Sequence, residues 1–249
     1  MPSGGRIVIL SGPSGVGKSP LEKALGRFFP ELRASLRSIV LYNDRAPRPG
    51  EVDGVDYHFR SRACIEGLRA DPRFAVMEVR GDLQALDLEE LGRLLSRSDG
   101  FFEGNPFVGQ ALLSRPELQG YERVSAFLAP LSREEILFLR QQRADLAAVV
   151  TDVMRRKLLR RTRRQKGELS LKDLENIEKR AASALGELAM AHRFGWVIPN
   201  HDGEDSENWD AFYHPLGDAR RALLGFAELL QGRVPASAER WEEDLIPAV

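Results

Sequence analysis

Short apolar runs alternate with longer amphipathic stretches along the chain. The first run, Ile7–Leu10, is β-branched and lies between glycines, which is typical of a buried parallel strand. A helical pattern through Leu21–Leu25 follows it and stops near Pro30. Five further runs predict the remaining strands: Ser38–Leu41, Phe74–Val79, Gly100–Glu103, Ser125–Leu128 and Trp196–Ile198.

The helical patterns lie between these strands. The longest, Arg133–Arg164, begins at Ser132 with a capping-box sequence, and Gly167 interrupts it. Three more helices are predicted: Leu86–Leu95, Leu171–His192 and Asp218–Gly232. This alternation predicts an α/β fold, a three-layer sandwich with a mostly parallel central sheet. The tail over 233–249 has no clear pattern.

Composition sets the broad class of protein. The 249 residues, of which 43% are hydrophobic, suit one globular α/β domain with insertions or a small lid. A net charge of −1 gives no sign of a nucleic-acid or membrane partner. The one cysteine, Cys64, excludes an intrachain disulfide and cannot hold zinc alone. No signal-peptide core or membrane-spanning run is present, so we expect a cytoplasmic protein.

The segment that follows the first strand carries the clearest chemistry. Residues 12–19 read Gly-Pro-Ser-Gly-Val-Gly-Lys-Ser, and the glycines let backbone N–H groups approach phosphate oxygens. Lys18 places a charge on the β- and γ-phosphates, and the Ser19 hydroxyl is a Mg²⁺ ligand. The sequence therefore predicts an ATP site with Mg²⁺. The residues expected to hold the nucleotide are Gly12, Ser14, Gly15, Val16, Gly17, Lys18 and Ser19.

Pro20 is unusual at its position directly after this loop. Phosphate loops usually supply a backbone N–H there, and proline has none. Two interpretations stay open. Proline is tolerated in the first turn of a helix, so it can be harmless. Otherwise the nucleotide loses one charge-assisted hydrogen bond, worth roughly 1.5–3 kcal/mol.

Two further segments resemble a known family. The run Arg45–Phe59 looks very like the monophosphate-binding segment of guanylate kinases, which are P-loop nucleoside monophosphate kinases, and Val197–Asp202 resembles the family's adenine-side strand end. The resemblance covers about residues 6–200 and marks the chain as a divergent relative. It implies one guanylate-kinase-like domain over 1–249. Its parts would be a monophosphate-binding subdomain (about 38–100), an extended helical lid region (about 133–192) and a C-terminal tail (about 233–249).

The resemblance also implies roles for individual residues. Arg45, Arg48 and the Tyr57 hydroxyl would converge on a monophosphate, and fixed cationic donors suit that task. Asn200 resembles the adenine contact, with a turn asparagine as the alternative. Arginines crowd the lid region, although a charge run is often only a solvated helix face. The residues expected to act in catalysis are Lys18, Arg45, Arg160, Arg164 and Arg180.

The base site departs from the family pattern. Leu41 replaces a hydroxyl that would contact substrate, and both tyrosines expected after Gly81 are missing. The guanine-reading glutamate falls on Glu78 or Val76, depending on a short gap. Glu103 and Asn105 stand where the family has two aspartates. Glu78, Glu103 and Asn105 are therefore candidate substrate contacts. Glu103 would also orient a Mg²⁺-bound water. These changes weaken the argument for GMP as the acceptor.

Three functions are therefore open. The first is phosphoryl transfer from ATP to a nucleoside monophosphate, GMP above others. The second is transfer to another phosphorylated acceptor, such as a phosphosugar. The third is a binding module that has lost catalysis. The extra helical sequence between about 144 and 172 suggests contacts within a homo-oligomer.

Overall fold

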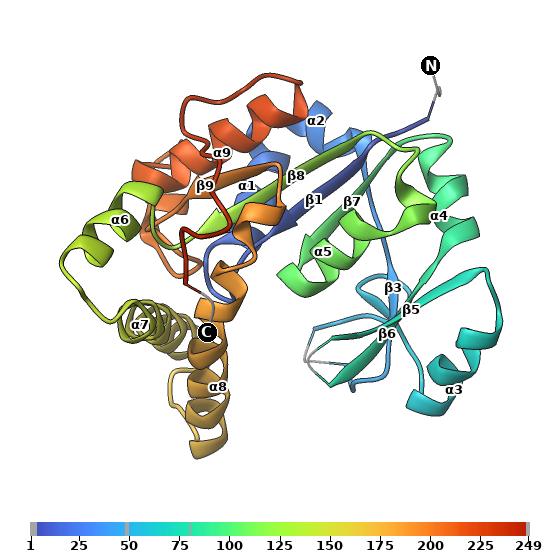
Figure 1. Ribbon diagram of the computed structural model, residues 1–249, viewed down its shortest axis with the longest axis horizontal. Coiled ribbons are helices and arrows are strands. Elements are labelled where there is room, and N and C mark those ends of the chain that lie inside the picture. Colours follow the sequence, from blue (N-terminus) through green and yellow to red (C-terminus); the bar gives the residue numbers. More distant parts are fainter. Residues whose placement is uncertain (1–3, 48–49, 80, 248–249) are drawn as a thin grey trace. The chain divides into compact units, whose positions relative to one another are not determined.

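The computed structural model describes residues 4–47, 50–79 and 81–247 (Figure 1). Two compact units divide the chain. The first unit holds the chain up to Val8, Ser35–Phe102 and Ala111–Arg123. The second unit holds Ile9–Ala34, Glu103–Gln110 and the chain from Val124 onward.

A five-stranded sheet has the strand order β2-β7-β1-β8-β9. Every residue of β1 is buried, as expected of an apolar strand covered on both faces. β2 pairs in parallel with β7, and β8 pairs in parallel with β9. The strands are β1 (Ile7–Ser11), β2 (Leu36–Ser38), β7 (Asp99–Gly104), β8 (Arg123–Ala129) and β9 (Trp196–Pro199). The predicted α/β class with a mostly parallel central sheet is confirmed.

Helices pack against this sheet within the second unit. Gly109 of α5 lies against Ile9 of β1, where a side chain would clash with Ser11. α9 packs on β9 and on α1, and α7 packs on α8. The helices are α1 (Lys18–Phe28), α2 (Pro30–Ser35), α5 (Pro106–Ser114), α6 (Arg133–Gln141), α7 (Leu146–Lys166), α8 (Leu171–Leu188) and α9 (Gly217–Leu230). No helix among the described residues is long and apolar enough to cross a membrane.

A second sheet, with strand order β4-β3-β6-β5, belongs to the first unit. β3 pairs in parallel with β4 and antiparallel with β6, and β5 pairs antiparallel with β6. One face packs on α3 through Ile65, which clusters with Leu83 and Ala85. The remaining elements of this unit are β3 (Leu41–Asn43), β4 (Tyr57–Phe59), α3 (Arg62–Gly67), β5 (Phe74–Val79), β6 (Asp82–Asp87) and α4 (Leu88–Leu95).

Three predicted elements differ from the structure. The strand predicted over Ser38–Leu41 is wrong, because β2 ends at Ser38 and β3 begins at Leu41. The helix predicted over Arg133–Arg164 is two helices. They are broken where Arg143 adopts φ 55° and Asp145 caps α7 with its side chain. The first residues of the helix predicted over Leu86–Leu95 belong to β6 instead.

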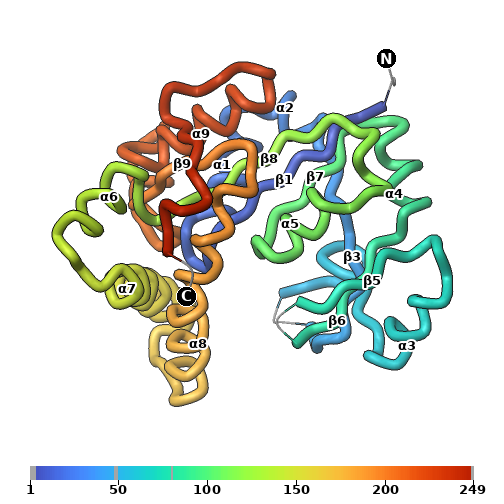
Figure 2. The backbone as a smooth tube through the Cα atoms, viewed as in Figure 1, coloured from blue at the N-terminus to red at the C-terminus, as the bar shows by residue number. Residues whose placement is uncertain are grey.

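The C-terminal tail packs against other parts of the second unit, to which it belongs. The chain beyond α9 runs back past β9, where Val197 and Glu239 form an antiparallel bridge (Figure 2). Trp241 is buried, and Glu242 accepts from Arg133 of α6 at 2.8 Å. The tail thus ties α6 to the edge of the central sheet.

Candidate functional site

The phosphate loop is shaped by its glycines. Gly12, Gly15 and Gly17 all have positive φ, a conformation that L side chains rarely adopt. A Cβ at Gly12 would lie 2.4 Å from the Leu128 carbonyl oxygen. Gly17 precedes α1 and provides no side-chain cap. The backbone N–H groups at the N-terminus of this helix can therefore bind an anion. This backbone fits the phosphates of a nucleotide.

Lys18 lies folded over the same loop. Its ammonium donates to the carbonyl oxygens of Gly12 at 2.9 Å and Pro13 at 3.1 Å. Ser19 follows in the first turn of α1, half-buried, with its side chain at the wall of a pocket. Pro20 also stands in this first turn, and the helical bond after it, from Leu21 N–H to the Gly17 carbonyl, is intact. Proline therefore fits the helix without breaking its ladder.

Glu103 lies near the end of β7, Asn105 follows that strand directly, and both residues belong to the second unit. Glu103 is half-buried, and burial raises the pKa of its carboxyl, although the charge of Lys18 opposes this shift. The side-chain oxygen of Asn105 accepts from the Phe107 N–H at 2.8 Å, and so caps the start of α5. No cluster of three or more His, Cys, Asp or Glu side chains in the described parts of the chain forms a metal site by itself. A hydroxyl with a nearby carboxylate nevertheless suits Mg²⁺, which takes much of its coordination from phosphate and water.

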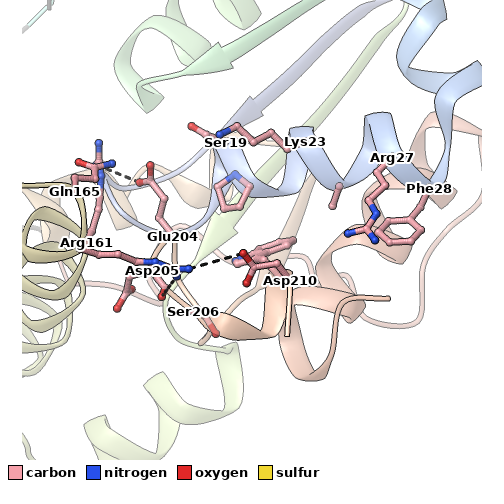
Figure 3. Close-up of a pocket in the computed structure, with 14 residues that line it drawn as sticks. Ser19, Lys23, Arg27, Phe28, Arg161, Gln165, Glu204, Asp205, Ser206 and Asp210 are labelled. Atoms are coloured by element: carbon pink, nitrogen blue, oxygen red, sulfur yellow. Dashed lines mark hydrogen bonds and ion pairs between the residues drawn. The ribbon is translucent and has the colours of Figure 1, made fainter. Parts of the chain in front are cut away.

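A cavity of about 400 Å³ begins at Ser19 and runs along α1 (Figure 3). α1, α7 and the loop after β9 each contribute part of its wall, so one face is basic and another is acidic. Its lining residues are Ser19, Pro20, Lys23, Ala24, Arg27, Phe28, Arg161, Arg164, Gln165, Glu204, Asp205, Ser206, Trp209 and Asp210.

Arginines of α7 face the acidic loop that lines this cavity. Arg160 binds Asp205 at 2.7 Å, and Arg164 lies 3.8 Å from Asp210. Arg161, which the sequence analysis did not single out as catalytic, binds Glu204 at 3.1 Å and lines the cavity (Figure 3). The sequence could not distinguish Arg161 from its neighbours, because six arginines lie close together between residues 155 and 164.

Arg180 of α8 reaches the phosphate loop. One of its guanidinium nitrogens donates to the Ser14 hydroxyl at 3.3 Å. The structure therefore brings Arg180, Lys18 and Ser19 to the same loop within the second unit.

Asn200 lies behind the phosphate loop. Its side chain is fully buried, and its amide nitrogen donates to the Val16 carbonyl at 2.7 Å. A Cβ at Gly17 would lie 2.6 Å from the same nitrogen. The expected direct contact between Asn200 and adenine is therefore wrong, because the Asn200 side chain has no exposed surface. Asn200 instead binds the backbone of the phosphate loop.

The expected monophosphate clamp lies in the first unit. Arg45 forms two hydrogen bonds with the Glu51 carboxylate, at 2.7 and 2.6 Å, and its guanidinium stacks 5.1 Å from the Tyr57 ring centre. Burial disfavours the charged form of Arg45, but the bonds to Glu51 outweigh it and raise its pKa. The predicted partner Arg48 lies outside the described residues.

Strand register sorts the other candidates onto two faces of the second sheet. Asn43 is paired with both Phe59 and Gln84, so these side chains share a face, and Tyr57 lies on it two residues from Phe59. Glu78 is opposite Leu83, on the other face, which packs on α3. The expectation that Glu78 reads the base beside Arg45 and Tyr57 is therefore wrong, and Val76 shares its unsuitable face.

Gln84 is a residue of the clamp face that sequence reasoning missed. It is buried, and its side-chain oxygen has no hydrogen-bond partner among the residues that the structure describes. In the sequence, Gln84 is marked only as a polar residue between apolar ones in Asp82–Asp87. The apolar pattern did not predict this segment as a strand, so the face on which Gln84 lies could not be inferred.

Comparisons with known proteins agree with this geometry. Residues 4–74 match a family model described as guanylate kinase. The guanylate kinase of Thiobacillus denitrificans is 33% identical over 201 residues, which cover 80% of this chain and 80% of the relative. The guanylate kinase of Pseudomonas fluorescens is 32% identical over 231 residues, with 93% of this chain and 92% of the relative covered.

A solved structure shares the fold. The crystal structure of guanylate kinase from Anaplasma phagocytophilum superposes with a TM-score of 0.54 and covers 92% of this chain and 86% of its own. Sequence identity between the two is 18%, so this likeness speaks for the fold alone.

Proposed function

The chain belongs to the guanylate kinase family, and on that premise we propose that it transfers the γ-phosphate of ATP to GMP. One observation carries the proposal: the chain combines a glycine-shaped phosphate loop under Lys18 with an arginine, Arg45, that is bonded to Glu51 and lies over the Tyr57 ring. The first feature suits a triphosphate and the second a monophosphate. Phosphoryl transfer requires both substrates to be positioned and their charge to be neutralised.

We assign the donor to the second unit. Backbone N–H groups of the loop Gly12–Gly17 would hold its phosphates, and the ammonium of Lys18 would turn from the loop carbonyls to the β- and γ-oxygens. Ser19 would hold Mg²⁺, with Glu103 oriented toward its water shell. When bound, Mg²⁺ neutralises charge on the phosphates. The cavity that begins at Ser19 would take the nucleoside.

The arginines of the second unit would neutralise charge on the transferring group. Arg180 already contacts the phosphate loop through Ser14. Arg161, Arg160 and Arg164 are paired with acidic residues of the loop after β9, so each would exchange a carboxylate for phosphate oxygens. Fixed guanidinium groups stabilise the charge that spreads over the equatorial oxygens.

We assign the acceptor to the first unit, on the face that carries Tyr57. Arg45 would bind the monophosphate with its orientation set by Glu51, and the Tyr57 hydroxyl would donate to the same group. Arg48 remains a proposed third donor. Reading of the base must rely on groups other than Glu78. Gln84 is a candidate, because it is buried on the face that carries Tyr57 and its side-chain oxygen has no hydrogen-bond partner among the described residues.

The other two functions are not carried forward. A phosphosugar acceptor has no supporting observation, and a binding module without catalysis has no use for the retained Lys18 and Ser19. A direct test is ADP release by a coupled assay with a panel of nucleoside monophosphates and phosphosugars. GMP should stimulate release most strongly. If a phosphosugar does so, or no acceptor does, the proposal fails.

A further inference from the structure

Lys157 is a buried lysine on the inner face of α7. Only 4% of it is exposed, and its neighbours on that face, Val150, Met154 and Leu158, are apolar and buried. An ammonium in such a place costs several kcal/mol unless its donors are satisfied. Its hydrogen-bond partners are therefore informative about what the residue does.

The ammonium binds the backbone of the loop after β9. It donates to the carbonyl oxygen of His201 at 2.5 Å and lies 3.4 Å from that of Asn200. A Cβ at Gly203 would lie 3.2 Å from the Lys157 nitrogen and 3.2 Å from the Gly15 carbonyl oxygen. Lys157 is thus placed where α7, this loop and the phosphate loop meet.

The loop that Lys157 holds is itself bonded to the phosphate loop. The Asn200 amide donates to the Val16 carbonyl at 2.7 Å, and the Glu204 N–H donates to the Gly15 carbonyl at 3.0 Å. These two bonds hold the carbonyls of Gly15 and Val16 toward the segment after β9. In a trans peptide the N–H points opposite to the carbonyl, so the Val16 and Gly17 N–H groups point the other way, and that of Val16 lies 3.3 Å from the Pro13 carbonyl oxygen.

We propose that Lys157 is a positioning residue for the donor nucleotide: its ammonium fixes the backbone at Asn200 and His201, and through that backbone fixes the phosphate loop. This role rests on the proposed function of the loop as an ATP site. It also explains why a lysine, rather than a fourth apolar residue, occupies this face of α7. A purely packing role would need no charge there.

The surroundings of Lys157 make its charge sensitive to pH. Burial lowers its pKa to about 8, and the carboxylates of Asp205, Asp202 and Asp218 oppose this, while Arg160 adds to it. His201, whose carbonyl accepts the bond, is itself paired with Glu135 and Asp218. The ammonium form, which makes the stronger hydrogen bonds, predominates below about pH 8 and is lost above it.

The test is the affinity for ATP with Mg²⁺, measured by calorimetry between pH 7 and 9.5, which needs no catalysis. The variant Lys157→Met keeps the stem and removes the charge, Lys157→Arg keeps the charge, and Lys166→Met is a control on the exposed end of the same helix. We expect Lys157→Met to weaken binding at pH 7 about tenfold or more, as the loss of a charged hydrogen bond does. The unmodified protein should weaken as pH rises through about 8, and Lys157→Met should not.

Lys157→Arg should restore much of the affinity, and Lys166→Met should bind as the unmodified protein does. Unchanged affinity in Lys157→Met, or the same pH profile in both proteins, would overturn the proposal. Should Lys157→Met fail to fold, a flat affinity profile through pH 8 in the unmodified protein would overturn it equally. Absence of GMP phosphorylation alongside tight, Lys157-dependent ATP binding would count against the proposed function alone.

Discussion

At the scale of single residues, Lys18 places a positive charge at the phosphate loop. Its ammonium is held by the Gly12 and Pro13 carbonyls, so it is already over the loop before any nucleotide arrives. When the nucleotide binds, the ammonium would turn to the phosphate oxygens, and its charge would then be in place before the reaction step.

The variant Lys18→Met should lower kcat about 10²–10³-fold, the range seen when one preorganised charge-stabilising donor is removed. Its melting temperature should change little, because the side chain is half-buried and methionine fills its stem. Steady-state kinetics and thermal melts would measure both, with the exposed Lys172→Met as the control. A Lys18→Met protein as active as the control would refute this role.

The carboxyl group of Glu103 affects the stability of the fold as well as the proposed reaction. Because burial raises its pKa, the native state binds this proton more tightly than the unfolded state does. The native state is therefore favoured by Glu103 at low pH, and that contribution is lost as pH rises through the raised value. At neutral pH the half-buried carboxylate of Glu103 therefore destabilises the fold.

Glu103→Gln should therefore melt at a higher temperature than the unmodified protein at pH 7, while its kcat falls. The difference in melting temperature should shrink at about pH 4, where both side chains are neutral. Thermal melts at the two pH values would measure the effect. A lower melting temperature for Glu103→Gln at pH 7 would contradict the assigned electrostatics.

At the scale of elements, His201 joins three of them. It follows β9, and its two ring nitrogens contact Asp218 of α9 and Glu135 of α6. The two carboxylates raise its pKa against the opposing effect of burial. The stabilisation from charged His201 is fully present below its unfolded value of about 6.5 and is lost as pH rises through the raised folded value.

His201→Asn should consequently destabilise the fold more at pH 6 than at pH 9. Denaturant unfolding at both pH values would measure this, with His214→Asn as the comparison on an exposed loop. An equal loss of stability at the two pH values would mean that His201 acts through packing and not through its charge.

The docked tail is a second feature of this scale. Trp241 is buried against the second unit, whereas Val234 near the start of the tail is 70% exposed. Trp241→Ala should cost about 3 kcal/mol of unfolding free energy, as large-to-small changes at buried aromatics do. Val234→Ala should stay within about 0.5 kcal/mol. Comparable small losses in both variants would show that the tail does not dock in solution.

Sequence patterns predicted the elements whose signals are local. The β-branched run at Ile7 and the capping box at Ser132 and Glu135 needed no tertiary information, and both are present. β6 was missed because its residues are nearly all buried, so no alternation marks a strand. The break before α7 was missed because its cap, Asp145, lies inside a long polar stretch without glycine or proline.

The same limit applies to the site. The phosphate loop could be predicted because its backbone geometry requires glycine at fixed spacing. The face on which Glu78 lies could not, since a shift of one residue in register moves a side chain to the other side of a sheet. Lys157 was missed because its partners are backbone carbonyls about 44 positions away, and backbone carbonyls leave no mark in a sequence.

At the scale of the whole molecule, the two units divide the chemistry. The loop under Lys18 belongs to the second unit and the arginine beside Tyr57 to the first, so the proposed reaction would use residues of both units. An altered base site is compatible with the proposed reaction, because the residues proposed to bind the two phosphate groups are present in both units.

The central claim is the transfer of a phosphoryl group from ATP to GMP. Its most direct measurement is chromatographic separation of the nucleotides after incubation of the protein with ATP, Mg²⁺ and GMP. We predict that GDP and ADP form in equal amounts, and that neither forms above background with the Lys18→Met variant. ADP without GDP, or no turnover of either nucleotide, would contradict the account.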